Sequence, residues 1–315
     1  MPLPGFFGQW LFPFLTNGGL LFMSLQICDR LYWPEGKIRA FTFSYDDGIE
    51  QDARLMEIAK NNGITGTFNL NPGLFGRQNM LAFSETPTQH YKWPADVIEE
   101  KYKGFEVAAH GLMHTSMYGV DQARCVAEIL DSRRELERLL RHPVEGYAYA
   151  FGVAEENVIS AMKACGMLYG RTITSTKKFE IPQDLLRWDP TCHHDDPELL
   201  SIADRFLSDA PEFSFYSPAK LFYLWGHAYE FDQFDHWNVI TELFEKVGNR
   251  DDVWYATNQD IADYIRAYRR LIYSVDGDIV YNPSSRSVWI GSMFTGQCKE
   301  IPAGATTELL PAYDM

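Results

Sequence analysis

The sequence predicts an α/β protein built on parallel strands, and three observations support this fold class. Apolar β-rich runs alternate with helical patterns from residue 37 to about residue 270. Strands separated by helices run parallel, so about seven such units close into a barrel or form a doubly wound sheet. The 315-residue chain has 46% hydrophobic and 15% aromatic residues, which is enough apolar surface for a large core. No glycine-rich nucleotide motif follows the first strand.

The predicted strands are short apolar runs bounded by glycine, proline or polar turn residues. They cover residues 38–45, 65–70, 105–109, 145–149, 167–173, 221–225 and 253–256. The first strand ends in Asp46-Asp47-Gly48, and Asn71-Pro72-Gly73 stops the second. We expect residues 74–93 and 174–195 to form two long loops.

The predicted helices have apolar residues at helical spacing. They cover residues 52–62, 122–141, 155–165, 237–247 and 261–272, and two more begin at Pro94 and Pro197. Proline suits the first turn of a helix, and Gly63 and Gly166 suit the position after the last turn. Thr257 and Asp260 have the spacing of a capping box.

The two ends of the chain differ in character from its middle. We predict that residues 1–22 are an N-terminal extension outside the fold, that 23–273 form the β/α unit and that 274–315 form a small β appendage. Within the appendage, residues 278–281 and 287–290 read as a hairpin around Asn282-Pro283. The apolar runs near the start are far shorter than the roughly 20 residues of a membrane span. They also lack a preceding Lys or Arg, which favours a cytoplasmic protein while leaving secretion open.

The overall charge and the cysteines exclude several classes of function. The net charge is −15, and a chain this acidic is repelled by phosphate backbones, so we expect no nucleic-acid partner. The five cysteines are far apart and form no CxxC pair. They therefore predict neither a disulfide framework nor a thiolate zinc site.

Polar residues with catalytic potential lie at the predicted strand ends, where β/α barrels carry their active sites. Asp46 and Asp47 close the first strand, and His110 and His114 follow the third. The four-residue spacing places both imidazoles on one side of a helical turn, so they could clamp a metal ion. Two histidines and one aspartate suit zinc or a similar divalent ion with open positions. The alternative is that Asp46-Asp47-Gly48 is only a turn and that the histidines bind nothing.

Three further histidines offer other roles. His227 ends a later strand and could be a general acid or base, or it could pack beneath Trp225. His193 and His194 lie in the run Cys192-His193-His194-Asp195-Asp196. That run could be a second metal site, a substrate-binding edge or a polar loop. We favour the substrate edge or the loop over a second metal.

In this order the residues resemble the polysaccharide deacetylase family, also called carbohydrate esterase family four, in a divergent branch. The family's five motifs are matched by Ser44-Tyr45-Asp46-Asp47-Gly48, His110-Gly111-Leu112-Met113-His114, Ala148-Tyr149-Ala150-Phe151-Gly152, loosely Arg187-Trp188-Asp189-Pro190, and Leu224-Trp225-Gly226-His227. The third match lacks the arginine and the proline of the family motif. The resemblance covers residues 37–270 and implies a distorted seven-stranded (β/α) barrel.

The resemblance also implies roles for individual residues. Asp47, His110 and His114 would hold one divalent ion, with zinc favoured over cobalt, nickel or manganese. Asp46 would be the general base, and His227 would protonate the leaving group. The backbone N–H of Phe151 would bind the oxyanion.

The missing arginine and the aromatic residues add two expectations. In the family, the third-motif arginine orients the base, but here Ala148 cannot, so we predict that Arg171 reaches Asp46 instead. The predicted substrate contacts are Tyr149, Trp188, His193, His194 and Trp225.

The resemblance thus implies a metal-dependent hydrolase acting on non-peptide carbon–nitrogen bonds. It would remove acetyl groups from an N- or O-acetylated sugar, oligosaccharide or glycan. Two alternatives stay open: an amidohydrolase acting on a small C–N bond, and a carbohydrate-binding pseudoenzyme, which the missing arginine motivates. An Fe(II) oxygenase is disfavoured, because its ligands usually follow another order on another fold.

Overall fold

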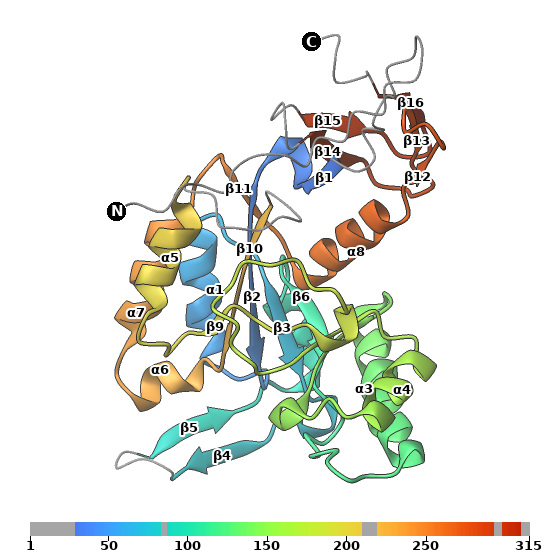
Figure 1. The fold of residues 1–315 in the computed structure, drawn as a ribbon. Helices are drawn as coiled ribbons and strands as arrows, with labels where there is room; N and C mark the ends of the chain where they lie inside the picture. The colour runs from blue at the N-terminus through green and yellow to red at the C-terminus, as the bar shows by residue number, and fades with distance from the viewer. Residues whose placement is uncertain (1–28, 83–86, 210–218, 293–297, 310–315) are drawn as a thin grey trace, which may run out of the picture.

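A curled sheet of parallel strands forms the centre of the protein (Figure 1). The computed structural model describes residues 29–82, 87–209, 219–292 and 298–309. The strands are β2 Arg39–Asp46, β3 Thr67–Leu70, β6 Glu106–Ala109, β7 Gly146–Ala148, β8 Tyr169–Arg171, β9 Cys192–His193, β10 Lys220–Gly226 and β11 Val253–Tyr255. They follow the order β8-β7-β6-β3-β2-β10-β9, and β11 pairs with the start of β2. Every pairing is parallel, and the distorted (β/α) barrel that the sequence predicts is confirmed.

The segment from Trp188 to His193 links the two edges of this sheet. Trp188 N donates to Gly170 O (2.9 Å) at the β8 edge, and Thr191 N donates to Tyr223 O (2.8 Å) of β10. This segment lies in a stretch that we expected to be a loop throughout. β9 was missed because a strand of two residues is too short to show an alternation of apolar and polar residues.

Helices lie on two sides of the curled sheet (Figure 1). They are α1 Asp52–Asn61, α2 Ile98–Lys101, α3 Gln122–Leu140, α4 Glu156–Ala164, α5 Leu199–Leu207, α6 Tyr229–Gln233, α7 Trp237–Val247 and α8 Asn258–Arg269. The side chain of Thr257 accepts from Asp260 N, as the capping-box spacing predicts. Apolar side chains between sheet and helices form the core, where Phe43 packs on Phe68 and Phe244. Among the described residues, none of the helices has both the length and the apolar character that crossing a membrane requires.

Residues 74–93 are not the loop that we expected. β4 Gln78–Leu81 and β5 Thr88–Tyr91 form an antiparallel hairpin, at the end of the molecule where β2 ends (Figure 1). Most side chains of β4 are exposed, so no alternation of apolar and polar residues marks this hairpin in the sequence. Its second strand is tied to the end of β2, because Glu50 N donates to Tyr91 O (2.9 Å) and Trp93 N to Gly48 O (3.1 Å).

Two small antiparallel sheets lie at the opposite end of the molecule (Figure 1). One has the order β1-β14-β15 and the other β12-β13-β16. Their strands are β1 Asp29–Tyr32, β12 Ile272–Tyr273, β13 Ile279–Tyr281, β14 Val288–Ser292, β15 Cys298–Ile301 and β16 Thr306–Glu308. The predicted hairpin is wrong, since β13 and β14 belong to different sheets. Asn282 Nδ2 donates to Arg286 O (2.8 Å) and Ile301 O (3.0 Å), which turns the chain from one sheet to the other.

The predicted division of the chain into three parts stays a prediction. The extension assigned to residues 1–22 lies outside the described residues. The early strand β1 pairs with β14, so the appendage is built from both ends of the described chain.

Candidate metal centre and active site

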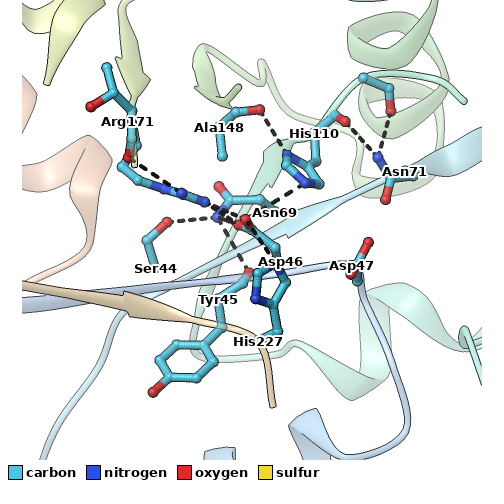
Figure 2. A network of polar contacts seen from close by, with 12 residues as sticks. Ser44, Tyr45, Asp46, Asp47, Asn69, Asn71, His110, Ala148, Arg171 and His227 are labelled. Carbon is cyan, nitrogen blue, oxygen red and sulfur yellow. Dashed lines mark hydrogen bonds and ion pairs between the residues drawn. The ribbon is translucent and has the colours of Figure 1, made fainter. Parts of the chain in front are cut away.

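The carboxyl ends of four strands bring the predicted site residues together (Figure 2). Asp46 ends β2, His110 follows β6, Arg171 ends β8 and His227 follows β10. Parallel strands place these ends at one edge of the sheet, as β/α active sites require. The possible ligand atoms of the predicted metal-binding set, Asp47, His110 and His114, all lie within 4.8 Å of one another.

Three residues at this edge have left-handed backbone angles. The φ angles of Asp47, His114 and Phe151 are 83°, 55° and 58°. Such angles cost roughly 1–3 kcal/mol for residues other than glycine, and they persist where surrounding contacts enforce them. Aspartate and histidine tolerate the left-handed region better than most residues. The strain therefore marks the turns that position the Asp47 and His114 side chains and the Phe151 amide.

His110 offers a free nitrogen to the candidate metal site. Its side chain is buried, and its Nδ1–H donates to Ala148 O (2.8 Å), which leaves the lone pair on Nε2. Nε2 has no hydrogen-bond partner, and an unsatisfied buried polar atom is rare in folded proteins. Burial lowers the pKa of His110 to about 4, so the ring is neutral near pH 7. Two imidazoles and one carboxylate with such an orphaned nitrogen fit a divalent ion.

Asp47 already has two basic partners, which the sequence analysis missed. Lys92 Nζ lies 3.0 Å from Asp47 Oδ1 and donates to Asp47 O (2.6 Å), and His90 Nε2 lies 3.1 Å from Asp47 Oδ2. Both side chains are buried, and Lys92 also donates to Asn71 Oδ1 (3.1 Å). Burial raises the pKa of Asp47, but Lys92 and His90 outweigh burial and hold the pKa well below its ordinary value. A metal ion at Asp47 would therefore share this carboxylate with an ammonium group.

Arg171 makes the contact with Asp46 that the sequence predicts (Figure 2). Its Nη2 donates to both carboxylate oxygens, at 2.5 Å for Oδ2, and Asn69 Nδ2 donates to Oδ1 (2.8 Å). A single guanidinium nitrogen therefore serves both oxygens. The guanidinium is fully buried and lies 4.7 Å from the ring centre of Trp225. Burial raises the pKa of Asp46, but Arg171, His110 and His227 together outweigh burial and hold the pKa below its ordinary value.

His227 faces the open side of Asp46. Its Nε2 lies 3.8 Å from Asp46 Oδ2, and His110 Nε2 lies 3.6 Å from the same oxygen. On the other side of the His227 ring, Nδ1 lies 3.2 Å from Glu230 Oε2. Burial lowers the pKa of His227, but Glu230, Asp46 and Asp47 together outweigh burial, and the pKa rises to about 9. Glu230 was missed, although its position three residues after a strand-end histidine is a local signal.

The predicted substrate contacts do not all reach solvent. Tyr149, Trp188 and His194 are at most 1% exposed, and Tyr149 Oη donates to Leu186 O (2.7 Å). A ring must be accessible to stack on a sugar, so burial corrects the expectation for these three residues and places them in the interior. Trp225 and His193 are half-buried.

Phe151 is 61% exposed, and its ring lies 4.7 Å from that of His114. An exposed aromatic ring therefore borders the candidate metal ligands.

The chain is similar to polysaccharide deacetylases in sequence and in fold. Residues 34–170 match the family model described as polysaccharide deacetylase. The match includes Asp46, Asp47, His110, His114 and Phe151, while Arg171 and His227 follow it. No curated protein matches the chain.

A comparison with solved structures finds one with the same fold and others of lower similarity. A proposed polysaccharide deacetylase from Mycobacterium smegmatis is 18% identical, with a TM-score of 0.51, over 76% of this chain and 94% of that one. A family 4 carbohydrate esterase from Streptomyces lividans in complex with acetate is 12% identical, with a TM-score of 0.42, over 70% and 92%. A family 4 pseudoenzyme from Bacillus anthracis is 16% identical, with a TM-score of 0.42, over 71% and 65%. Over residues 34–170 the chain is therefore similar to the polysaccharide deacetylase family.

Proposed function

We propose that the protein is a metal-dependent hydrolase that removes acetyl groups from an N- or O-acetylated sugar, oligosaccharide or glycan. The family match supports a carbohydrate deacetylase. The observation that carries the proposal is the position of Asp46, whose Oδ2 lies between the nitrogen of a proposed metal ligand and the nitrogen of a proposed acid.

Asp47, His110 and His114 would hold the ion, and we propose zinc. When bound, a divalent ion supplies Lewis acidity, which polarises a carbonyl group and acidifies a water molecule. His110 contributes a neutral nitrogen that is aimed by its bond to Ala148 O. His90 and Lys92 fix the orientation of the Asp47 carboxylate.

Asp46 would act as the general base. Arg171 donates to both oxygens and Asn69 donates to Oδ1, which fixes the plane of the carboxylate with Oδ2 facing His110 and His227. Because Arg171 keeps the pKa of Asp46 below its ordinary value, the group is ionised near neutral pH and can accept a proton at Oδ2. Arg171 thus supplies the cation that Ala148 cannot, which weighs against the pseudoenzyme alternative.

His227 would act as the general acid. A pKa of about 9 keeps the ring protonated near neutral pH, so Nε2 can donate to a leaving amine or alcohol. Glu230 would favour the protonated ring from the side of Nδ1. The backbone N–H of Phe151, in a turn with positive φ, would donate to the developing oxyanion. The exposed ring of Phe151 and the ring of Trp225 would contact the sugar.

The test is acetate release by purified full-length protein from N-acetylated chitooligosaccharides, O-acetylated xylan and small acetamides, with zinc supplied. Release from a glycan that disappears in Asp46→Asn supports the proposal. Hydrolysis of the small amides alone would favour the amidohydrolase, and glycan binding without turnover would favour the pseudoenzyme.

A further inference from the structure

A second cluster of metal-binding side chains lies beside the candidate active site. His193, His194 and Asp195 follow one another at the end of β9, and Glu230 comes from α6. Each of the four offers a ligand atom, and these atoms all lie within 4.8 Å of one another. The cluster shares no residue with Asp47, His110 and His114.

His194 is built into this cluster as a buried, unpaired nitrogen donor. Its side chain is 0% exposed and stacks on Tyr45, with 5.6 Å between ring centres. A Cβ at Gly226 would lie 1.9 Å from His194 Nδ1, so a glycine is required there for the ring to fit. His194 Nδ1 lies 3.1 Å from Tyr45 Oη, while Nε2 has no hydrogen-bond partner.

The unpaired Nε2 points at two carboxylates. It lies 3.2 Å from Asp195 Oδ1 and 3.5 Å from Glu230 Oε2 without hydrogen-bond geometry to either. In the neutral tautomer that has its proton on Nδ1, Nε2 carries a lone pair facing two carboxylate oxygens, and a cation between these atoms would stabilise the arrangement. Metal–ligand bonds of about 2.1 Å at octahedral or tetrahedral angles separate the ligand atoms by about 3.0–3.4 Å. The two observed separations are close to this range.

Two more histidines support the carboxylates. His193 Nδ1 accepts from Asp195 N (3.1 Å), so a neutral His193 ring carries its proton on Nε2, which lies 3.2 Å from Glu230 Oε2. His236 Nε2 lies 2.7 Å from Asp195 Oδ1. Both rings are therefore placed to orient carboxylate ligands, as neighbours of metal sites commonly do.

We propose that His194, Asp195 and Glu230 bind a second divalent metal ion, through His194 Nε2 and a carboxylate oxygen of each acidic residue. One imidazole and two carboxylates suit Zn²⁺ or Mn²⁺. This proposal departs from the substrate edge or polar loop that the sequence favoured, because a fully buried His194 cannot contact a substrate.

The test is the number of metal ions bound per full-length chain. The protein is stripped with a chelator, titrated with Zn²⁺ and with Mn²⁺ by calorimetry, and analysed for metal after dialysis. We expect two ions in the wild type, one in His110→Ala/His114→Ala, one in His194→Ala, and none when all three changes are combined. His142→Ala is the matched control, because this exposed histidine lies outside both clusters, and it should keep two ions.

The variants separate failure of this site from failure of the proposed active site. One ion in the wild type that is lost in His110→Ala/His114→Ala would overturn the second site, and so would two ions in His194→Ala. One ion that survives in His110→Ala/His114→Ala but is lost in His194→Ala would support the second site and contradict the first. If circular dichroism shows that His194→Ala is unfolded, Asp195→Asn replaces it. The affinity of Asp195→Asn for one of the two ions should be at least about tenfold lower than that of the wild type. Unchanged affinity for both ions would overturn the proposal.

Discussion

Lys92 should oppose metal binding at Asp47, and replacing it should strengthen that binding. The ammonium and the carboxylate are 3.0 Å apart and both are nearly buried, with side-chain exposures of 3% and 10%. At an effective dielectric constant of about 20, this pair attracts by about 5 kcal/mol. Removing one partner of a buried pair costs about 3–5 kcal/mol, because the remaining charge is left uncompensated. Lys92→Met should therefore destabilise the metal-free protein by about this amount.

A divalent ion would restore the missing positive charge at Asp47. If binding recovers only about 1.4 kcal/mol of the lost stabilisation, the affinity for the ion rises tenfold. Loss of the repulsion between the ammonium and the ion acts in the same direction. We expect Lys92→Met to bind Zn²⁺ at least about tenfold more tightly by calorimetry and to show a larger zinc-induced rise in Tm than the wild type.

Lys246→Met is the matched control, because Lys246 pairs with Asp204 at 2.7 Å in a partly exposed position away from the site. Its zinc affinity should equal that of the wild type. Weaker zinc binding by a folded Lys92→Met would refute the reasoning, since orientation of Asp47 by Lys92 would then outweigh the repulsion between the ammonium and the ion.

Three further predictions concern other buried charges. Arg171→Lys should lower kcat on the order of tenfold to a thousandfold with unchanged metal content, because the shorter side chain draws the cation away from Asp46. An unchanged kcat in an acetate-release assay would count against orientation of Asp46 by Arg171. Acetate release should fall as the pH rises through about 9, where His227 loses its proton. Glu230→Gln removes a charge that raises the pKa of His227, so in a pH–rate profile this variant should show the fall at lower pH. An alkaline limb that stays in place would argue against this pair. Burial raises the pKa of Asp52 to about 8, whereas its pKa in the unfolded chain is about 3.9. Between these pH values the native state binds more protons than the unfolded state, so the free energy of unfolding should fall as the pH rises from about 4 to about 8. Asp52→Asn should flatten this dependence in urea unfolding at pH 5, 7 and 9, and an unchanged slope would assign it to other groups.

The residues at the strand ends could be predicted because strand position alone determines where they lie. Once β2, β6 and β10 are recognised, the parallel arrangement brings Asp46, His110 and His227 to one edge. Arg171 could be predicted for the same reason, since β8 ends at that edge too. Its use of a single nitrogen depends on the side-chain path in the interior, and no sequence pattern reports that path.

The residues that were missed lie on segments whose apolar residues show no helical or strand periodicity. His90 and Lys92 come from a hairpin with mostly exposed residues on its first strand, and their contact with Asp47 spans more than forty residues. The appendage was misread for a related reason, because the partner of β14 is a strand near the other end of the described chain. Pairings over such distances leave no trace in local spacing.

The most direct test of the central claim is the rate of acetate release from an acetylated glycan by protein that has been stripped of metal and then reconstituted with zinc. The account predicts that the stripped protein is inactive, that zinc restores turnover, and that Asp46→Asn keeps its zinc at the Asp47, His110 and His114 site without turning over. Equal turnover by stripped and reconstituted protein, or full turnover by Asp46→Asn, would contradict it.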